Sequence, residues 1–372
     1  MPQSTRRRRF PVVPKLTWDS NTELVSLQLS LQPHQELVVP PHYSTELHSW
    51  FLDQVRRIDS GLSTYLHDGQ SEKPFTISQL QGPIQSQGRS LKLMADSSYH
   101  WNITALSNPV VKWMNQWLQS LPNEIHLRNG SFKITDWNFA YPPTTYAQLA
   151  ETSIPEQPSI TLSFLTPTSF RRKGNHLPLP MPVNVFHSYL CHWSKFSGEE
   201  IDQDDFLDWV DEFVIILRHQ IQSAKVIAGK SGSVTGFTGS VQFGLSSRAK
   251  EDRDYVELWL ALGQFAPYCG TGHKTTFGLG QTAPGWLNPT ETAAPFVQNL
   301  LAQRISELTE VFAAQRKRRG GDRTINIAET WATILARREM GESLKAIAED
   351  LEMPYETVRT YAKLARRALK QS

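Results

Sequence analysis

The sequence has few cysteines, no long apolar run and almost no net charge, and each shortage excludes a class of protein. Two lone cysteines among 372 residues, Cys191 and Cys269, indicate neither a disulfide scaffold nor a zinc site, and they favour the cytoplasm. No apolar stretch approaches the roughly 18 residues of a membrane span. The basic residues near the N-terminus are not followed by the apolar segment of a secretory signal. We therefore expect no membrane partner.

The net charge of +2 predicts no partner, but the distribution of charge is informative. Residues 316–372 contain 13 Lys and Arg against 8 Asp and Glu, whereas the first 315 residues contain 25 and 28. The C-terminal segment is therefore the basic part of the chain, as expected of a segment that contacts a polyanion. A solvated helical face would explain the same charge equally well.

The order of predicted elements indicates an α+β protein with two tandem ferredoxin-like (RRM-like) domains. Each domain has the order strand, helix, strands, helix, strand, which is typical of this fold. In the first domain we expect strands that include 23–32, 74–80, 90–94 and 124–139. In the second we expect helices at 184–193 and 252–264. The predicted units are a flexible leader (1–19), the two ferredoxin-like domains (20–143 and 144–285), a helix with a basic linker (286–323) and a helix-turn-helix domain (324–372).

The last of these units is predicted from the segment Ser343–Leu369. One amphipathic helix ends at Met353–Pro354, and a second, basic helix follows with Val358, Leu364 and Ala365 expected on its inner side. A short turn between two such helices is the helix-turn-helix layout, and it resembles the DNA-binding domains of sigma factors and response regulators. Such modules also bind RNA or protein. The candidate recognition residues are Tyr355, Thr357, Arg359, Thr360 and Lys363.

Residues 270–280, GTGHKTTFGLG, place four glycines around His273 and Lys274. Glycine at this density indicates left-handed backbone or a close approach between chain segments. One interpretation is a tight connection after a helix. The other is an anion-binding loop in which backbone N–H groups hold phosphates, with His273 and Lys274 adding charge. The loop matches neither the Walker pattern nor the dinucleotide fingerprint, so a polynucleotide is the favoured ligand.

The spacing of Gly270, Gly272, Gly278 and Gly280 resembles the C-terminal glycine loop of the RAMP superfamily of CRISPR-associated proteins. The segments TPTSFRRKGN and LPLPMPVNVFHSYLCHW are similar to parts of the second domain of the CRISPR repeat-processing endoribonucleases of this superfamily. This resemblance implies a metal-independent nuclease without a cofactor. Its expected partner is CRISPR repeat RNA, with effector-complex subunits as further candidates. DNA is a candidate partner through the C-terminal helix-turn-helix.

The segment 39–69 is similar to the first helical segment of those nucleases, and its YLH triplet ends at His67. The resemblance implies that His67 is catalytic and that Lys73, six residues later, belongs to the active site. Some family members also carry a tyrosine at the position of Leu52, so the sequence supports a pair of His67 and Lys73. His48 is the next catalytic candidate, although a surface or RNA-contacting position is expected for it, and His42 is the third.

These residue types suit RNA cleavage in which the 2′-OH attacks the adjacent phosphate. Imidazole can accept or donate a proton near neutral pH, and a nearby cation can stabilise the charge that develops on the phosphorane. The resemblance implies products with 5′-hydroxyl and 2′,3′-cyclic phosphate ends. We expect further RNA contacts from the basic turn Arg171, Arg172 and Lys173, although an ordinary exposed turn would have the same composition. The acidic run 199–205 is expected to be a solvated loop, and no metal site is predicted.

Three functions remain open on the sequence. The leading hypothesis is an endoribonuclease that cleaves pre-crRNA. The alternatives are a non-catalytic RAMP subunit that holds crRNA in an effector complex and a DNA-binding regulator that uses the helix-turn-helix. The pair of His67 and Lys73 favours the first hypothesis over the second, and the glycine loop favours both over the third.

Overall fold

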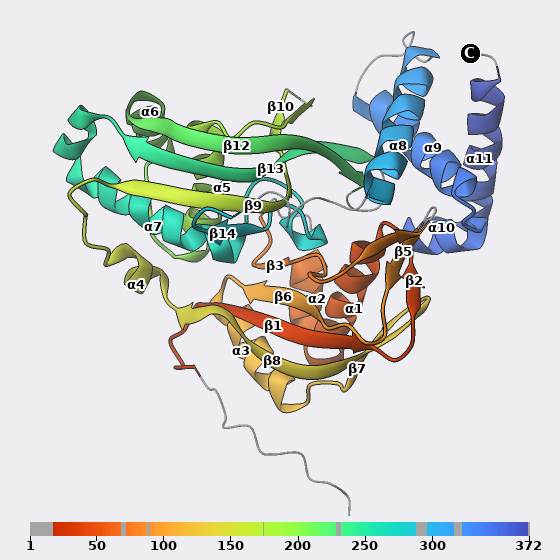
Figure 1. Ribbon diagram of the computed structural model, residues 1–372, viewed down its shortest axis with the longest axis horizontal. Coiled ribbons are helices and arrows are strands. Elements are labelled where there is room, and N and C mark those ends of the chain that lie inside the picture. The colour runs from red at the N-terminus through yellow and green to blue at the C-terminus, as the bar shows by residue number, and fades with distance from the viewer. Residues whose placement is uncertain are drawn as a thin grey trace, which may run out of the picture.

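The computed structural model places two antiparallel sheets one above the other and a group of helices beside them (Figure 1). It describes residues 18–67, 72–87, 90–173, 175–227, 232–287, 296–315 and 322–370. Most of the predicted leader and part of the predicted basic linker lie outside these ranges. Among the described helices, none is long and apolar enough to cross a membrane.

The N-terminal sheet has the strand order β3-β6-β1-β8-β7. Its strands are β1 (Leu24–Pro33), β3 (Phe75–Ile77), β6 (Tyr99–Ala105), β7 (Glu124–Leu127) and β8 (Gly130–Thr144). The alternating leucines Leu27, Leu29 and Leu31 of β1 are fully buried, because one face of the strand packs against helices. These helices are α1 (Tyr43–Ile58), α2 (Ser60–His67) and α3 (Asn108–Gln119). The first strand thus lies inside the sheet, as the ferredoxin-like fold requires.

One strand prediction in this domain is wrong, and another is confirmed with a pairing that the sequence did not specify. The segment expected to form one strand at 124–139 is a hairpin of β7 and β8, which turns at Asn129. The strand predicted at 90–94 is β5 (Ser90–Leu93), but it pairs with β2 (Leu37–Val39) and β4 (Gln85–Gln87) in a separate small sheet. Local sequence patterns indicate that a segment is extended but do not specify the strand with which it pairs.

The C-terminal sheet repeats the arrangement with the order β12-β13-β9-β14. Its strands are β9 (Ser159–Thr168), β12 (Val214–Ile227), β13 (Ser233–Leu245) and β14 (Thr282–Pro284), and the small hairpin of β10 (Phe170–Arg172) and β11 (Asn175–Leu177) follows β9. The helices are α4 (Tyr146–Ala150), α5 (Pro182–Phe196), α6 (Gln203–Phe213) and α7 (Arg253–Cys269), with the short 3-10 turns η1 (Ser247–Glu251) and η2 (Thr275–Phe277). Its apolar core includes Phe186, Trp193 and Trp259.

The acidic run is not the predicted loop throughout. Helix α6 begins inside it, and the Asp202 side chain accepts hydrogen bonds from the N–H groups of Asp204 and Asp205 at 3.2 Å each. Aspartate is favoured at this capping position, and further acidic residues in the first turn interact favourably with the helix dipole. The acidic residues therefore start a helix.

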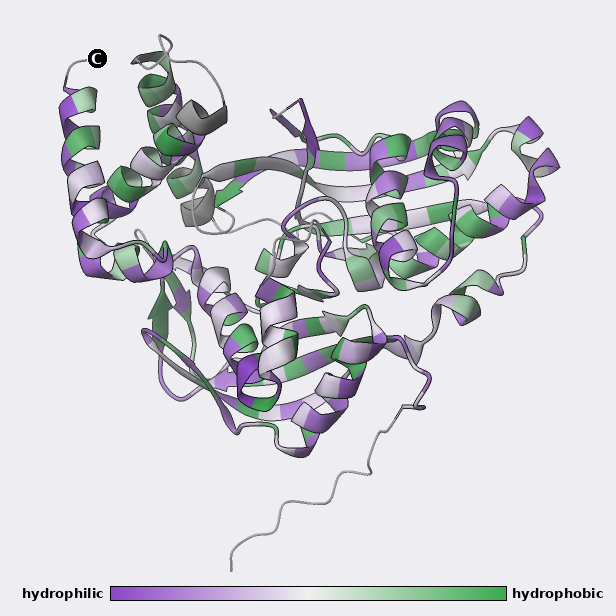
Figure 2. Cartoon of the chain, turned by 180° about the vertical axis from the view of Figure 1, so that it is seen from behind, coloured by the Kyte–Doolittle hydropathy of each residue, from purple (hydrophilic) through white to green (hydrophobic). Residues whose placement is uncertain are grey.

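The C-terminal helices are α8 (Phe296–Gln315), α9 (Asp322–Glu339), α10 (Leu344–Asp350) and α11 (Tyr355–Leu369). The Ser343 side chain caps α10, and a short turn leads into α11, where hydrophilic and hydrophobic bands alternate (Figure 2). Val358, Ala362 and Ala365 form the buried side of α11. Leu364 is 39% exposed, so its predicted inward position is wrong.

A buried polar cluster joins these helices to the N-terminal domain. Arg337 of α9, 3% exposed, donates to Asp350 (2.5 Å) and Glu342 (2.6 Å) and contacts His42 Nε2 at 2.7 Å. Arg128 contacts the other oxygen of Asp350 at 2.7 Å. Ligand atoms of His42, Glu342 and Asp350 lie within 4.8 Å of one another, a spacing suited to a metal, but the Arg337 guanidinium lies among them. Sequence spacing could not reveal this group, because His42 and Asp350 are 308 residues apart.

Candidate active site

The three predicted catalytic residues line one pocket of about 380 Å³. His67 is the last residue of α2, Lys73 precedes β3, and His48 lies on α1. Thr276 and Phe277 of η2, within the glycine loop, also line it. The pocket therefore forms where the two ferredoxin-like domains meet. Residues 68–71, between His67 and Lys73, lie outside the described ranges.

His67 is exposed at the mouth of this pocket, and Lys73 is half-buried. An exposed imidazole beside a half-buried ammonium can reach a phosphate that enters from solvent. Leu52, at the position where the resemblance suggests a tyrosine in some relatives, is buried in the same wall. Its side chain gives the pocket an apolar surface and supplies no hydroxyl. The geometry thus brings together the predicted pair of His67 and Lys73.

His48 is not the surface residue that the sequence suggested. Its ring is half-buried and stacks on Phe277 with the ring centroids 4.3 Å apart. The His48 ring also stacks on Phe75, with the centroids 6.1 Å apart. Stacking between these rings holds the glycine loop against α1. His48 therefore lines the pocket from the interface between the two domains.

His42, the third candidate, is 4% exposed and belongs to the polar cluster with Arg337 and Asp350. It is absent from the residues that line the pocket. Its place at the N-terminus of α1 explains both observations, because the chain enters the helix there beneath α10. The structure gives His42 a role in packing and not in the pocket.

The glycine loop is a tight connection, and several of its N–H groups are already bonded. The N–H of Thr271 donates to the Gly280 carbonyl at 2.8 Å, and that of Gly272 donates to Ser188 Oγ at 2.7 Å. The N–H groups of His273 and Gly280 donate to the carbonyls of Ser169 and Pro167, both at 3.2 Å. These four donors cannot also bind phosphate, so the predicted anion-binding loop is wrong at these positions.

The glycines are needed because the backbone is left-handed and crowded. Gly280 has a φ of +65°, and a Cβ there would lie 1.9 Å from the Thr271 carbonyl oxygen. Gly272 has a φ of +79°, and its Cβ would lie 2.3 Å from the Ser169 oxygen. No side chain fits either gap.

We expect Gly280→Ala to lower the free energy of unfolding by about 1–3 kcal/mol more than Gly285→Ala, measured by urea denaturation. Gly285 is a matched control, since its φ is +86° and a Cβ there would meet nothing within 4 Å. The Gly285→Ala variant should therefore lose only the strain energy of a left-handed alanine, about 1–2 kcal/mol. Equal losses in the two variants would show that the crowding at Gly280 relaxes without penalty.

The two cations predicted to bind phosphate from the loop are mostly buried. Burial lowers the pKa of His273 to about 4, so its ring is uncharged at neutral pH. His273 Nδ1 donates to the Ser169 carbonyl at 2.8 Å, and the ring stacks on His176. Burial, together with the charge of Arg171, lowers the pKa of Lys274 to about 8. His273 therefore does not add the expected positive charge.

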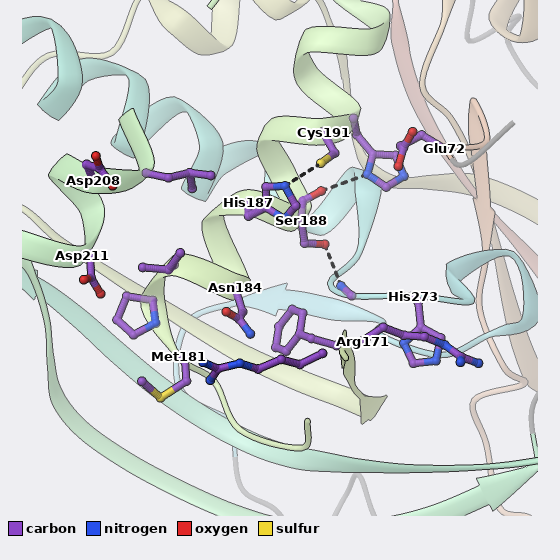
Figure 3. Close-up of a pocket in the computed structure, with 17 residues that line it drawn as sticks. Glu72, Arg171, Met181, Asn184, His187, Ser188, Cys191, Asp208, Asp211 and His273 are labelled. Atoms are coloured by element: carbon purple, nitrogen blue, oxygen red, sulfur yellow. Dashed lines mark hydrogen bonds between the residues drawn. The ribbon is translucent and has the colours of Figure 1, made fainter. Parts of the chain in front are cut away.

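The predicted basic turn is exposed and lies at one side of a larger groove of about 690 Å³. Arg171 and Arg172 extend from β10, and Lys173 follows them in the turn. Figure 3 shows Arg171 and His273 on one side of the groove and the carboxylates of Asp208 and Asp211 on the other. Glu72, the neighbour of Lys73, also lines it, so the groove adjoins the pocket with His67.

Comparison with known proteins agrees with this arrangement. The N-terminal domain characteristic of CRISPR Cas6 proteins matches residues 24–139, and the CRISPR-associated endoribonuclease Cas6 family matches residues 162–282. The two matches follow each other in order and together span most of the chain. The chain belongs to the Cas6 family.

Individual Cas6 relatives are distant. The endoribonuclease Cas6 of Streptococcus thermophilus is 22% identical over 250 residues, which are 67% of this chain and 91% of the relative. That of Mycobacterium tuberculosis strain CDC 1551 is 30% identical over 145 residues, 38% of this chain and 43% of the relative. A Cas6 product complex has a TM-score of 0.58 at 22% identity and covers 70% of this chain and all of the other. The structure of a Thermus thermophilus Cas6 has a TM-score of 0.54 at 22% identity, and the match covers 71% of this chain and 99% of the other. These structures support the α+β fold.

The helices α8 to α11 lie beyond both Cas6 family matches. Of the predicted recognition residues on α11, Tyr355, Arg359, Thr360 and Lys363 are exposed and Thr357 is half-buried. The turn before α11 also contributes Glu352 to the pocket that contains His67. Sequence reasoning missed this contact, because Glu352 has neither a motif nor a spacing that relates it to the N-terminal domain.

Proposed function

We propose that this chain binds CRISPR repeat RNA and cleaves pre-crRNA without a metal ion, by attack of the 2′-OH on the adjacent phosphate. The observation that carries this proposal is the convergence of His67, Lys73 and His48 in one pocket. Membership of the Cas6 endoribonuclease family and the likeness in fold to Cas6 product complexes support it. The products would carry 2′,3′-cyclic phosphate and 5′-hydroxyl ends, in the form of mature crRNAs.

In the proposed reaction the 2′-oxygen forms a bond to phosphorus while the bond from phosphorus to the 5′-oxygen breaks. The hydroxyl proton passes to a base, and an acid protonates the departing 5′-oxygen. His67 is the group we assign to proton transfer, because it is the exposed imidazole at the pocket mouth. Lys73 lies in the same pocket, where its ammonium would stabilise the extra charge on the phosphorane oxygens.

Arg171, Arg172 and Lys173 would bind the RNA backbone beside the pocket. All three are exposed, Arg171 and Arg172 line the larger groove, and a guanidinium can bind a phosphate through two parallel hydrogen bonds. Gly270, Gly272, Gly278 and Gly280 would act indirectly, by holding Phe277 against His48.

The decisive experiment incubates an end-labelled RNA that contains a CRISPR repeat from the source genome with excess protein in EDTA. We expect one cut per repeat, no cut when the nucleotide before the scissile phosphate is 2′-deoxy, and a 3′ end that resists phosphatase until acid opens the cyclic phosphate. A requirement for Mg²⁺, or a product with a free 3′-hydroxyl, would contradict the mechanism. Tight binding without any cut would favour a non-catalytic subunit that holds crRNA.

A further inference from the structure

The C-terminal helices take part in the pocket that we assign to RNA cleavage. The turn between α10 and α11 places Glu352 in the wall that also contains His48 and His67. Glu352 has a left-handed backbone with a φ of +51°, so this turn has a defined local shape. A DNA-binding module joined only by a flexible linker would not be expected to line this pocket.

The buried cluster around Asp350 fixes this arrangement. Asp350 ends α10, two residues before Glu352, and it contacts His42 and Arg128 of the N-terminal domain as well as Arg337 of α9. His42 precedes the first residue of α1, the helix that carries His48. One set of ion pairs therefore positions both the α10–α11 turn and a wall of the pocket.

A stripe of basic side chains runs along α11 away from the pocket. Arg359, Lys363, Arg366 and Lys370 follow one another at intervals of four, three and four residues, so they lie on one side of the helix, and all four are exposed. Tyr355, 46% exposed, stands at the end nearest Glu352. From Tyr355 to Lys370 the helix rises about 22 Å. We call these five residues the basic stripe.

The far end of the basic stripe enters a groove of about 530 Å³ between α9 and α11. Lys363, Arg366 and Lys370 line it together with Arg338 and Arg367. The acidic Glu339 also lines it, but this carboxylate is paired with Arg304 at 2.8 Å. Glu356, beside the stripe, contacts Arg359 at 3.4 Å. The groove therefore presents several cations around one neutralised acid.

We propose that the basic stripe binds the single-stranded RNA that flanks the cleavage site, so that the C-terminal helices are part of the substrate cleft. This inference rests on the proposed function. Phosphates would contact the four cations, and a base would stack on Tyr355. RNA is favoured over DNA because the stripe begins at the pocket. The N-terminal end of α11, which in DNA-binding modules reads bases in the major groove, here adjoins the pocket wall.

The test compares Lys363→Gln/Arg366→Gln/Lys370→Gln with a control that also removes three exposed cations, Lys112→Gln/Lys133→Gln/Lys195→Gln. Affinity is measured between 50 and 200 mM salt for a repeat RNA with a 2′-deoxy group at the cut site. Each lost phosphate contact on single-stranded RNA reduces the slope of log affinity against log salt by about 0.7. We expect a slope smaller by about 2 for the stripe variant and an unchanged slope for the control.

The flank is identified by shortening the RNA on either side of the cut. Loss of one flank should weaken binding to the wild type and leave the stripe variant unaffected, while the cleavage rate at saturating protein stays the same in both. Equal salt slopes for the two triple variants, or a defect confined to duplex DNA, would overturn the inference. If the wild type binds the repeat but never cuts it, the proposed nuclease function fails, and the salt slopes still decide whether the stripe binds RNA.

Discussion

Replacing His67 by alanine is expected to reduce the single-turnover cleavage rate by about 10²- to 10⁴-fold, the usual contribution of one general acid or base. The imidazole lies at the mouth of the pocket that also contains Lys73, and its removal leaves proton transfer to water. Affinity for a repeat RNA with a 2′-deoxy group at the cut site should remain close to that of the wild type. The measurement is the cleavage rate with protein in excess at saturating concentration.

His126→Ala is the matched control, because it removes an imidazole that is 73% exposed on β7, away from the pocket. This variant should cleave at the wild-type rate. Undiminished cleavage by His67→Ala would refute the assignment and make His48→Ala the next variant. For His48 the thermal midpoint must be measured beside the rate, because its ring also stacks on Phe277 and its loss would loosen the domain interface.

The parts of the fold that follow from local sequence patterns could be predicted. The alternation in β1 and the apolar faces of α1 and α3 have periods that depend only on neighbouring residues, so the α+β class was accessible. His67 and Lys73 could be paired because six residues separate them and the family resemblance identified both. The start of α6 at Asp202 was also visible in principle, since an aspartate before further acidic residues is a common helix start.

Contacts between distant segments could not be predicted in the same way. The stack of His48 on Phe277, the entry of Glu352 into the pocket and most of the hydrogen bonds that occupy the glycine loop join residues far apart in the sequence. Each of these residues is locally compatible with an exposed position, and only tertiary packing buries or orients it. The glycines illustrate the point, because the same spacing suits an anion-binding loop and a crowded connection.

The second large effect is expected from the polar cluster that attaches the C-terminal helices. Arg337→Met keeps most of the side-chain volume but leaves Asp350 and Glu342 without their buried cation. Removal of one partner from a buried ion pair typically lowers stability by about 3–5 kcal/mol. We expect a loss of this size for Arg337→Met, seen in urea unfolding and as faster hydrogen exchange in α10. Arg359→Met, whose side chain is 65% exposed, is the control and should change little.

The dependence on pH gives this prediction a distinct signature. Burial alone would raise the pKa of Asp350, but its hydrogen bond with His42 and the charge and hydrogen bonds of Arg337 and Arg128 hold that pKa well below its ordinary value. A carboxyl group with a lowered pKa in the folded state stabilises the protein above its unfolded pKa of about 3.9, and this contribution disappears as the pH falls toward the folded value.

The difference in unfolding free energy between wild type and Asp350→Asn should therefore be constant from about pH 5 to 8 and shrink below about pH 4. Asp19→Asn, at an exposed aspartate, should show no such difference. If the stability of Asp350→Asn follows that of the wild type at every pH, the cluster does not attach the C-terminal helices, and another contact must hold Glu352 in the pocket.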